Sequence, residues 1–170
     1  MGDDAFKYHG MSSRCSALGQ LLEGKKALRV MEVHSPLSAM LVETMSCPSA
    51  AGDIEFDAFW SSSLADATQR GKPDIELVEF SSRFASVSDI FDVTTKPLIF
   101  DADTGGPVEH LPYHIKTAER LGISAFVIED KIGPKKNSLL GVEALQCQAS
   151  IDEFASKIRI AKAAQNTPYF

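Results

Sequence analysis

The sequence has no long apolar run, no apolar leader at its N-terminus and no excess of basic residues. No stretch of 18 consecutive apolar residues occurs in the chain, which argues against a transmembrane helix. The first residues, MGDDAFKYH, are polar and lack the apolar core of a signal peptide. The net charge is −6, whereas nucleic-acid binding needs a basic surface. We therefore expect a cytoplasmic protein that acts on a small molecule, with no nucleic acid and no membrane as partner.

Cysteine is scarce, and two familiar binding motifs are missing. Cys15, Cys47 and Cys147 show no metal-ligand spacing and fit free thiols in a reducing compartment. No Gly-x-Gly-x-x-Gly follows the first predicted strand, which argues against dinucleotide binding. His110 and His114 are four residues apart, but no His-Glu-x-x-His motif accompanies them.

Four short apolar runs alternate with helical patterns. Strands are predicted over residues 28–34, 54–60, 97–101 and 123–128. Helices are predicted from Ser12 or Ser13 to Gly24, from Pro36 through Val42, from Ser86 or Ser88 through Phe91, over residues 107–121, and from a capping box at Ser150–Glu153. Pro112 is expected to bend or restart the fourth of these helices.

This alternation predicts an α/β fold with a parallel sheet. We interpret residues 1–11 as a flexible tail and residues 12–170 as one domain. The pattern alone leaves two architectures open: an open doubly wound sheet and a (β/α)8 barrel of the TIM type. About four βα units are present, which is half of the eight that such a barrel needs.

Carboxylates follow the last two predicted strands. Asp101 and Asp103 are two residues apart, so both side chains can point to one face, and Glu129 ends the next strand. Hard oxygen donors at neighbouring strand ends suit Mg²⁺. The alternative is that Asp103 caps the following helix and that Glu129 faces water.

Two polar segments could bind an anion. Lys131, Lys135, Lys136, Asn137 and Ser138 could clamp a phosphoryl or carboxylate group. The run from Trp60 to Leu64 places three serines after a strand, where successive amides can form an anion nest. A solvated surface loop and a serine-rich loop without a ligand are the respective alternatives.

Four motifs together resemble the phosphoenolpyruvate mutase branch of the isocitrate lyase superfamily. They are FWSSSL (59–64), GKPD (71–74), DADTGG (101–106), and EDK (129–131) followed by KKNSL (135–139). The resemblance runs from about Leu18 to the end of the chain.

The resemblance implies a Mg²⁺-dependent (β/α)8 barrel that interconverts phosphoenolpyruvate and phosphonopyruvate, forming a carbon–phosphorus bond. It implies that Mg²⁺ is held by Asp101, Asp103 and Glu129. It implies that substrate is bound by Trp60, Ser62, Ser63, Leu64 and Asp101. It further implies that the catalytic residues are Asp74, Lys135, Asn137 and Ser138, the last three on a gating loop. In this reading Asn137 stabilises the migrating phosphoryl group.

The same loop separates the branches of the superfamily. The lyases carry Lys-Lys-Cys-Gly-His where this chain has KKNSL, so lyase activity is not expected. Asn137 favours the mutase and leaves phosphonopyruvate hydrolase as the alternative. Because the chain ends at Phe170, where the family's fifth strand would begin, we expect it to be inactive alone. We also expect a homo-oligomer. A non-catalytic family member with a residual metal and anion site is the remaining alternative.

Overall fold

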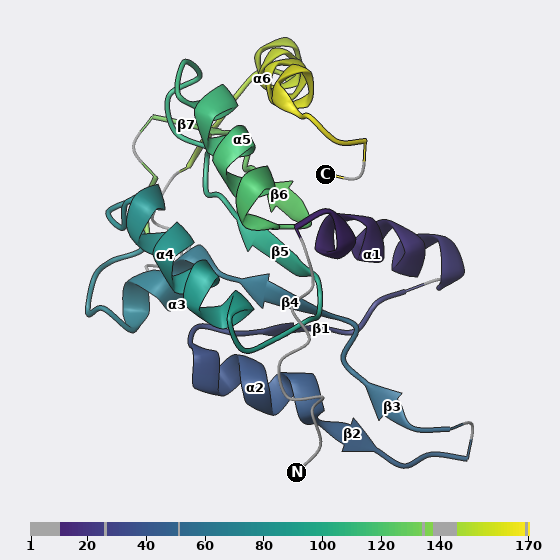
Figure 1. Cartoon of the computed structure of the whole chain (residues 1–170). Coiled ribbons are helices and arrows are strands. Elements are labelled where there is room, and N and C mark those ends of the chain that lie inside the picture. The colour runs from purple at the N-terminus through teal and green to yellow at the C-terminus, as the bar shows by residue number, and fades with distance from the viewer. Residues whose placement is uncertain (1–10, 26, 51, 134, 138–145, 169) are drawn as a thin grey trace.

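The fold is organised around a four-stranded parallel sheet (Figure 1). The computed structural model describes residues 11–25, 27–50, 52–133, 135–137, 146–168 and 170. The strands of the sheet, in spatial order, are β1 (Val30–Glu32), β4 (Ala58–Ser61), β5 (Leu98–Asp101) and β6 (Ala125–Val127). All neighbouring pairs are parallel, which confirms the predicted parallel α/β sheet. The spatial order follows the chain order without reversal, and the sheet is not closed within the described residues.

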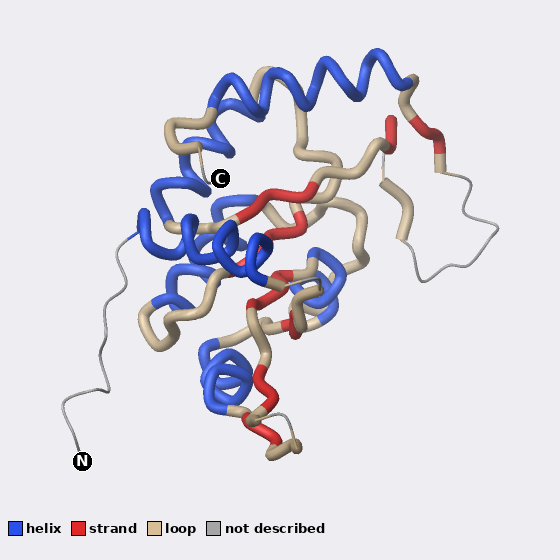
Figure 2. The backbone as a smooth tube through the Cα atoms, turned by 90° about the vertical axis from the view of Figure 1, so that its right-hand side faces the viewer, coloured by secondary structure: helices blue, strands red, loops and turns tan. Residues whose placement is uncertain are grey.

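Six described helices and two small antiparallel hairpins surround this sheet. The helices are α1 (Met11–Gly24), α2 (Pro36–Thr44), α3 (Ser63–Thr68), α4 (Phe80–Phe91), α5 (Leu111–Leu121) and α6 (Ile151–Ala164). The hairpins pair β2 (Ser46–Cys47) with β3 (Ile54–Glu55), and β7 (Lys131–Ile132) with β8 (Cys147–Gln148). In Figure 2, α6 lies at the top of the molecule and the β2–β3 hairpin at the bottom. Every helix in the described ranges is too short or too polar to span a bilayer.

The predicted strand 54–60 is wrong as a single element, because it is interrupted at Phe56 and Asp57. The buried Asp57 carboxylate accepts a hydrogen bond from the Arg29 amide at 2.8 Å and pairs with Lys25. The Asp57 amide donates to the Arg29 carbonyl at 2.8 Å. These bonds fix residue 57 between two strands, so β3 joins the outer hairpin and β4 joins the central sheet.

Two helix starts also differ from prediction. Helix α4 begins at Phe80 rather than at Ser86 or Ser88, since the Ser86 hydroxyl donates to the Ser82 carbonyl inside the helix and caps nothing. Helix α5 begins at Leu111, and Pro112 occupies its first turn, where no backbone N–H is needed. Pro112 therefore restarts the helix and does not bend it. The predicted capping boundary before α6 is confirmed by reciprocal bonds between Ser150 and Glu153. Of the predicted 1–11 tail, only Met11 is described, and it begins α1.

One face of the sheet forms the main core against α4. Leu98 and Phe100 in β5 are fully buried and share a cluster with Phe84 and Val87 of α4. Burial of each such side chain contributes roughly 1.5–3 kcal/mol. The alternation of a strand places Asp101 on the opposite face, where the side chains of β5 are only partly buried. The polar residues considered below gather at the carboxyl end of that face.

Glu119 of α5 ties the end of the chain to the rest of the fold. Its carboxylate accepts hydrogen bonds from the Asn166 amide at 2.9 Å, from the Asn166 side chain at 2.8 Å and from the Thr167 amide at 2.5 Å. Burial by itself would raise the pKa of the Glu119 carboxyl, but these bonds outweigh burial and lower the pKa below its ordinary value. Ionised Glu119 therefore holds the segment that follows α6 against α5.

Replacing Glu119 by Gln is expected to lower the free energy of unfolding at pH 7 by about 1–3 kcal/mol, because an amide nitrogen would face N–H donors. A carboxyl with a lowered folded-state pKa stabilises the fold above its unfolded-state pKa of 4.5, and that contribution is lost as the pH falls below it. The difference between parent and Glu119→Gln in urea unfolding should therefore shrink from pH 7 to pH 3. A constant difference across this range would contradict the assignment.

Candidate active site

The carboxyl end of β5 carries two linked carboxylates. The Asp103 amide donates to Asp101 Oδ1 at 3.0 Å, so the two residues form one structural unit. Asp103 has a φ of 53°, in the left-handed region that residues other than glycine adopt only rarely. Gly105, with a φ of 81°, completes the turn, and a Cβ there would lie 3.0 Å from Ile128 Cγ2. The DADTGG motif thus encodes a tight turn that holds Asp101 and Asp103 together.

The serine segment after β4 packs against this turn. Ser62 caps α3 by accepting a hydrogen bond from the Ala65 amide at 3.3 Å. Ser63 donates to Asp101 Oδ2 twice, from its amide at 3.0 Å and from its hydroxyl at 2.8 Å. The predicted substrate-binding residues Ser62 and Ser63 therefore lie beside Asp101, and Ser63 supports the acidic residue directly.

Lys135 is buried among these side chains and not in a solvated loop. Its side chain is 2% exposed. The ammonium nitrogen lies 3.0 Å from Asp74 Oδ1 and 3.1 Å from Ser63 Oγ, and it also contacts Asp103 Oδ1. The surface-loop alternative is therefore wrong for Lys135. Three distant motifs, around residues 63, 74 and 103, converge on one ammonium group.

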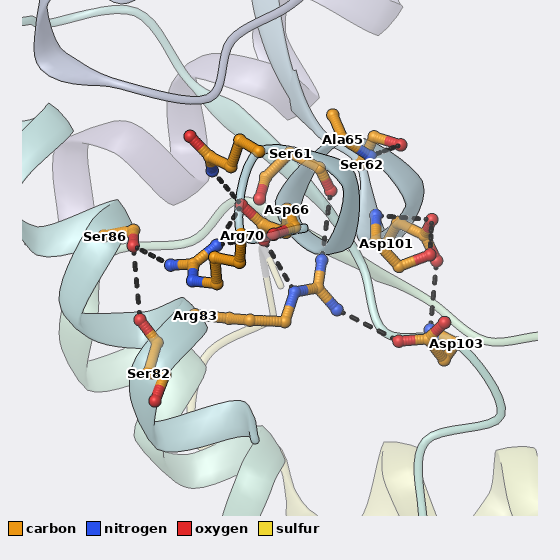
Figure 3. Close-up of polar contacts among 12 residues, drawn as sticks. Ser61, Ser62, Ala65, Asp66, Arg70, Ser82, Arg83, Ser86, Asp101 and Asp103 are labelled. Carbon is orange, nitrogen blue, oxygen red and sulfur yellow. Dashed lines mark hydrogen bonds and ion pairs between the residues drawn. The ribbon is translucent and has the colours of Figure 1, made fainter. Parts of the chain in front are cut away.

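Arg83 provides a second buried cation that the sequence did not point to. In Figure 3 its guanidinium lies between Asp66 and Asp103. Nε is 2.7 Å from Asp66 Oδ2, Nη1 is 3.2 Å from Asp103 Oδ2, and Nη2 is 3.5 Å from the Ser61 carbonyl. The group also lies 4.2 Å above the Phe100 ring. An arginine within the polar stretch Ser81–Arg83 resembles an ordinary surface residue of a helix, so only its contacts reveal the role.

The charges of this cluster do not balance. Its members are the carboxylates Asp66, Asp74, Asp101 and Asp103 and the cations Arg70, Arg83 and Lys135. Asp66 binds both arginines, at 2.7 Å to Arg83 and 3.4 Å to Arg70. One negative charge is left in excess when all groups are ionised. Such an excess attracts a further cation.

The pKa values of the central groups shift in different directions. Burial would raise the pKa of the Asp101 carboxyl, but hydrogen bonds from the Ser63 and Asp103 amides outweigh it and lower that pKa. Burial raises the pKa of the Asp103 carboxyl despite the opposing effect of Lys135 and Arg83. Burial would lower the pKa of Lys135, whereas its bonds to Asp103 and Asp74 raise it and keep the ammonium protonated. Neighbouring carboxyls with opposite shifts are typical of functional sites.

Glu129 is linked to the acidic turn through its backbone. Its amide donates to the Asp103 carbonyl at 2.7 Å, while its carboxylate lies 2.7 Å from the Lys131 ammonium. Within the described ranges, no three acidic, histidine or cysteine side chains lie close enough together to form a metal centre. The structure thus brings Asp101 and Asp103 together and places Glu129 on the adjoining strand end, paired with Lys131.

The remaining predicted residues come from β4, from α3 and from the segments that contain Asp74 and Asn137. Trp60 of β4 and Leu64 of α3 are half-buried, and Asp74 is buried against Lys135. Asn137 is half-buried in the same short segment as Lys135. Ser138 lies outside the described residues.

Known proteins are similar to this chain in sequence and in fold. The family model for phosphoenolpyruvate phosphomutase matches residues 18–170. The phosphoenolpyruvate phosphomutase of Streptomyces hygroscopicus is 35% identical over 155 residues, which cover 90% of this chain and 46% of that protein. The phosphonopyruvate hydrolase of Variovorax sp. (strain Pal2) is 33% identical over 150 residues, 88% of this chain and 48% of that protein. Lyases also occur among the relatives.

Solved structures agree with the sequence comparison. The crystal structure of phosphoenolpyruvate phosphomutase from Streptomyces platensis subsp. rosaceus aligns with a TM-score of 0.79 and 32% identity, covering 95% of this chain and 52% of that one. A phosphonopyruvate hydrolase complex with oxalate and Mg²⁺ aligns with a TM-score of 0.76 and 30% identity, covering 92% and 50%. The chain spans about half the length of the relatives it matches. Since the family match extends over nine-tenths of the sequence and includes every motif of the site, the chain belongs to the phosphoenolpyruvate phosphomutase family.

Proposed function

We propose that this chain is half of a (β/α)8 barrel. It carries the acidic residues of a phosphoenolpyruvate mutase site. The observation that carries the proposal is the convergence of Asp74, Asp103 and Ser63 on the buried Lys135 ammonium, beside Asp101. The uniform strand order supports a barrel half, because each crossover moves in the same direction along the sheet. The proposed reaction interconverts phosphoenolpyruvate and phosphonopyruvate: the bond from phosphorus to the enol oxygen breaks and a bond from phosphorus to carbon 3 forms.

The donors at the strand ends are of the chemical type that a hard divalent cation takes, but in the described residues they are not gathered into a three-residue centre, and Glu129 is paired with Lys131. Asp101, Asp103 and Glu129 offer carboxylate oxygens at adjoining strand ends, and such oxygens are the ligands that Mg²⁺ prefers. The excess of negative charge in the cluster favours a cation there, and the related hydrolase was solved with oxalate and Mg²⁺. We propose that these three residues hold Mg²⁺, directly or through water. When bound, the ion would neutralise charge on the substrate oxygens.

The protein side chains would bind the substrate and exclude water. In the proposal, the Ser62–Leu64 segment and Trp60 bind the substrate carboxylate, as the family resemblance implies. Lys135 and Asn137, with Ser138, stabilise the negative charge of the migrating phosphoryl group. A loose phosphoryl-transfer transition state needs such positioning and charge stabilisation more than covalent help. A closed lysine segment would also keep water from the phosphoryl group, which distinguishes a mutase from a hydrolase.

The lysine segment fills the site in the structure. The Lys135 ammonium occupies the position between Ser63 Oγ, Asp74 Oδ1 and Asp103 Oδ1. A cation that binds Asp103 Oδ1 would therefore have to displace Lys135. The Lys135 ammonium and a divalent cation would compete for the same carboxylate oxygens of Asp103.

The reaction is tested by ³¹P NMR of phosphonopyruvate incubated with the protein and Mg²⁺. Formation of phosphoenolpyruvate is expected for the mutase. Formation of inorganic phosphate and pyruvate would support the hydrolase, the second candidate that the 33% identical relative favours. No turnover, together with retained binding of Mg²⁺ and oxalate, would point to a binding role. Because the chain spans half the length of its relatives, turnover is measured for the chain alone and after addition of the C-terminal half of a relative.

Replacing Asp101 by Asn is expected to weaken Mg²⁺ binding, measured by isothermal titration calorimetry. Loss of a residue that only supports a metal ligand costs roughly 10- to 100-fold in affinity, so loss of a ligand should cost at least as much. Asp89→Asn is the matched control, because Asp89 is an exposed carboxylate of α4. If both variants bind Mg²⁺ like the parent, Asp101 is not a ligand.

Replacing Lys135 by Ala should lower the free energy of unfolding in EDTA by about 3–5 kcal/mol, because Asp74 and Asp103 would remain buried without their ammonium. Addition of Mg²⁺ should restore more stability to this variant than to the parent. Lys136→Ala is the control; Lys136 is exposed, and its replacement should change stability by at most about 0.5 kcal/mol. Equal effects of Mg²⁺ on the parent and on Lys135→Ala would refute the competition.

A further inference from the structure

Arg83 makes contacts that go beyond holding α4 in place. Its side chain is 2% exposed, and its guanidinium spans from Asp66 on α3 to Asp103 after β5 (Figure 3). A guanidinium stays protonated in proteins, so its burial requires negative partners. Two buried carboxylates meet this requirement, but one of them, Asp103, also binds Lys135. The arginine therefore acts on the group at the centre of the candidate active site.

The orientation of the guanidinium is fixed on the side away from Asp103. Nε donates to Asp66 Oδ2 at 2.7 Å, and the planar group lies 4.2 Å from the centre of the Phe100 ring. Phe100 is fully buried in β5, one residue before Asp101. Asp66 is itself held by Arg70 and Gln69. Since a guanidinium is rigid and planar, fixing Nε and the ring face also fixes the position of Nη1.

Nη1 in turn fixes one oxygen of Asp103. It donates to Oδ2 at 3.2 Å, so Oδ1 faces the opposite side, toward Lys135. The backbone of Asp103 is in the left-handed region, which is unfavourable for a residue with a Cβ and so needs compensating contacts. The same residue binds Asp101 Oδ1 through its amide. A change in the Asp103 conformation would therefore move Asp101 as well.

We propose that Arg83 is a positioning residue for the paired carboxylates Asp101 and Asp103, and that it presents Asp103 Oδ1 to the cation of the site. The inference rests on the proposed function in one respect, namely that this cation is Mg²⁺. Arg83 does not touch the cation; it acts through Asp103. The positioning role requires a positive charge and the planar guanidinium with its several N–H donors. Lysine supplies only the charge.

The chain contains a matched control for a buried arginine. Arg14 of α1 is 4% exposed and lies 4.2 Å above the ring of Phe91. It donates to the carbonyls of Lys96 and Phe91, which precede β5, and thus binds at the opposite end of that strand from Asp101. Replacement of Arg14 removes a buried guanidinium and its ring contact without touching the paired carboxylates.

The test measures Mg²⁺ affinity by calorimetry and stability by urea unfolding for Arg83→Met, Arg83→Lys and Arg14→Met. We expect the dissociation constant to rise about 10- to 100-fold in Arg83→Met and by less in Arg83→Lys. Arg14→Met should lose stability and keep its dissociation constant within about twofold of the parent value, as expected for independent sites.

Three results would overturn the proposal. One is parental Mg²⁺ affinity in a folded Arg83→Met, and the second is equal weakening in Arg83→Met and Arg14→Met. If Arg83→Met does not fold, parental affinity in Arg83→Lys is the third.

If the parent itself binds no Mg²⁺, the proposed function fails. Crystal structures then decide the positioning role, because Asp103 must change its side-chain orientation in Arg83→Lys for the role to stand.

Discussion

The candidate site depends on one buried carboxylate, Asp103, shared by two cations. Its oxygens bind Lys135 on one side and Arg83 on the other, and its main chain binds Asp101 and Glu129. A buried charge is tolerated only with partners of opposite sign, so each of these groups constrains the others. Helix α4, the turn after β5 and the lysine segment are therefore held in one arrangement.

The same arrangement explains how a small sheet supports a polar centre. The helix-facing side of β5 is fully apolar at Leu98 and Phe100, which provides the packing energy. The opposite side carries Asp101 at the strand end, where the chain leaves the sheet and backbone donors become available. Ser63 and Asp103 supply such donors to its carboxylate. Their hydrogen bonds keep Asp101 ionised although it is partly buried.

Several parts of this structure were predictable from local sequence. The apolar runs and their turns predicted the parallel sheet, and the capping sequence at Ser150 predicted the start of α6. Asp101 and Asp103 lie together as predicted, but the predicted reason was wrong: β5 ends at Asp101, and the left-handed turn after the strand, not strand alternation, brings Asp103 beside it. The family resemblance connected Lys135 and Asp74 to the same site, which their separation in sequence would not have shown.

Other parts depend on contacts between distant residues, and local patterns do not contain them. The break at Asp57 arises from bonds to Lys25 and Arg29. The start of α4 was misplaced because serine is common both at helix caps and inside helices. Arg83 gave no signal, because a polar residue of an amphipathic helix usually faces solvent. Its role becomes evident only when α3, α4 and β5 are placed together.

The glycine turn after Asp103 has a mechanical consequence. Gly105 packs where a Cβ would approach Ile128 Cγ2 to 3.0 Å and Leu111 Cδ1 to 3.3 Å. Ile128 immediately precedes Glu129, so the spacing between the acidic turn and Glu129 is set by this apolar contact together with the hydrogen bond from the Glu129 amide to the Asp103 carbonyl. Enlarging or trimming the side chain at position 128 would thus change the distance between the acidic turn and Glu129 without altering any charged residue.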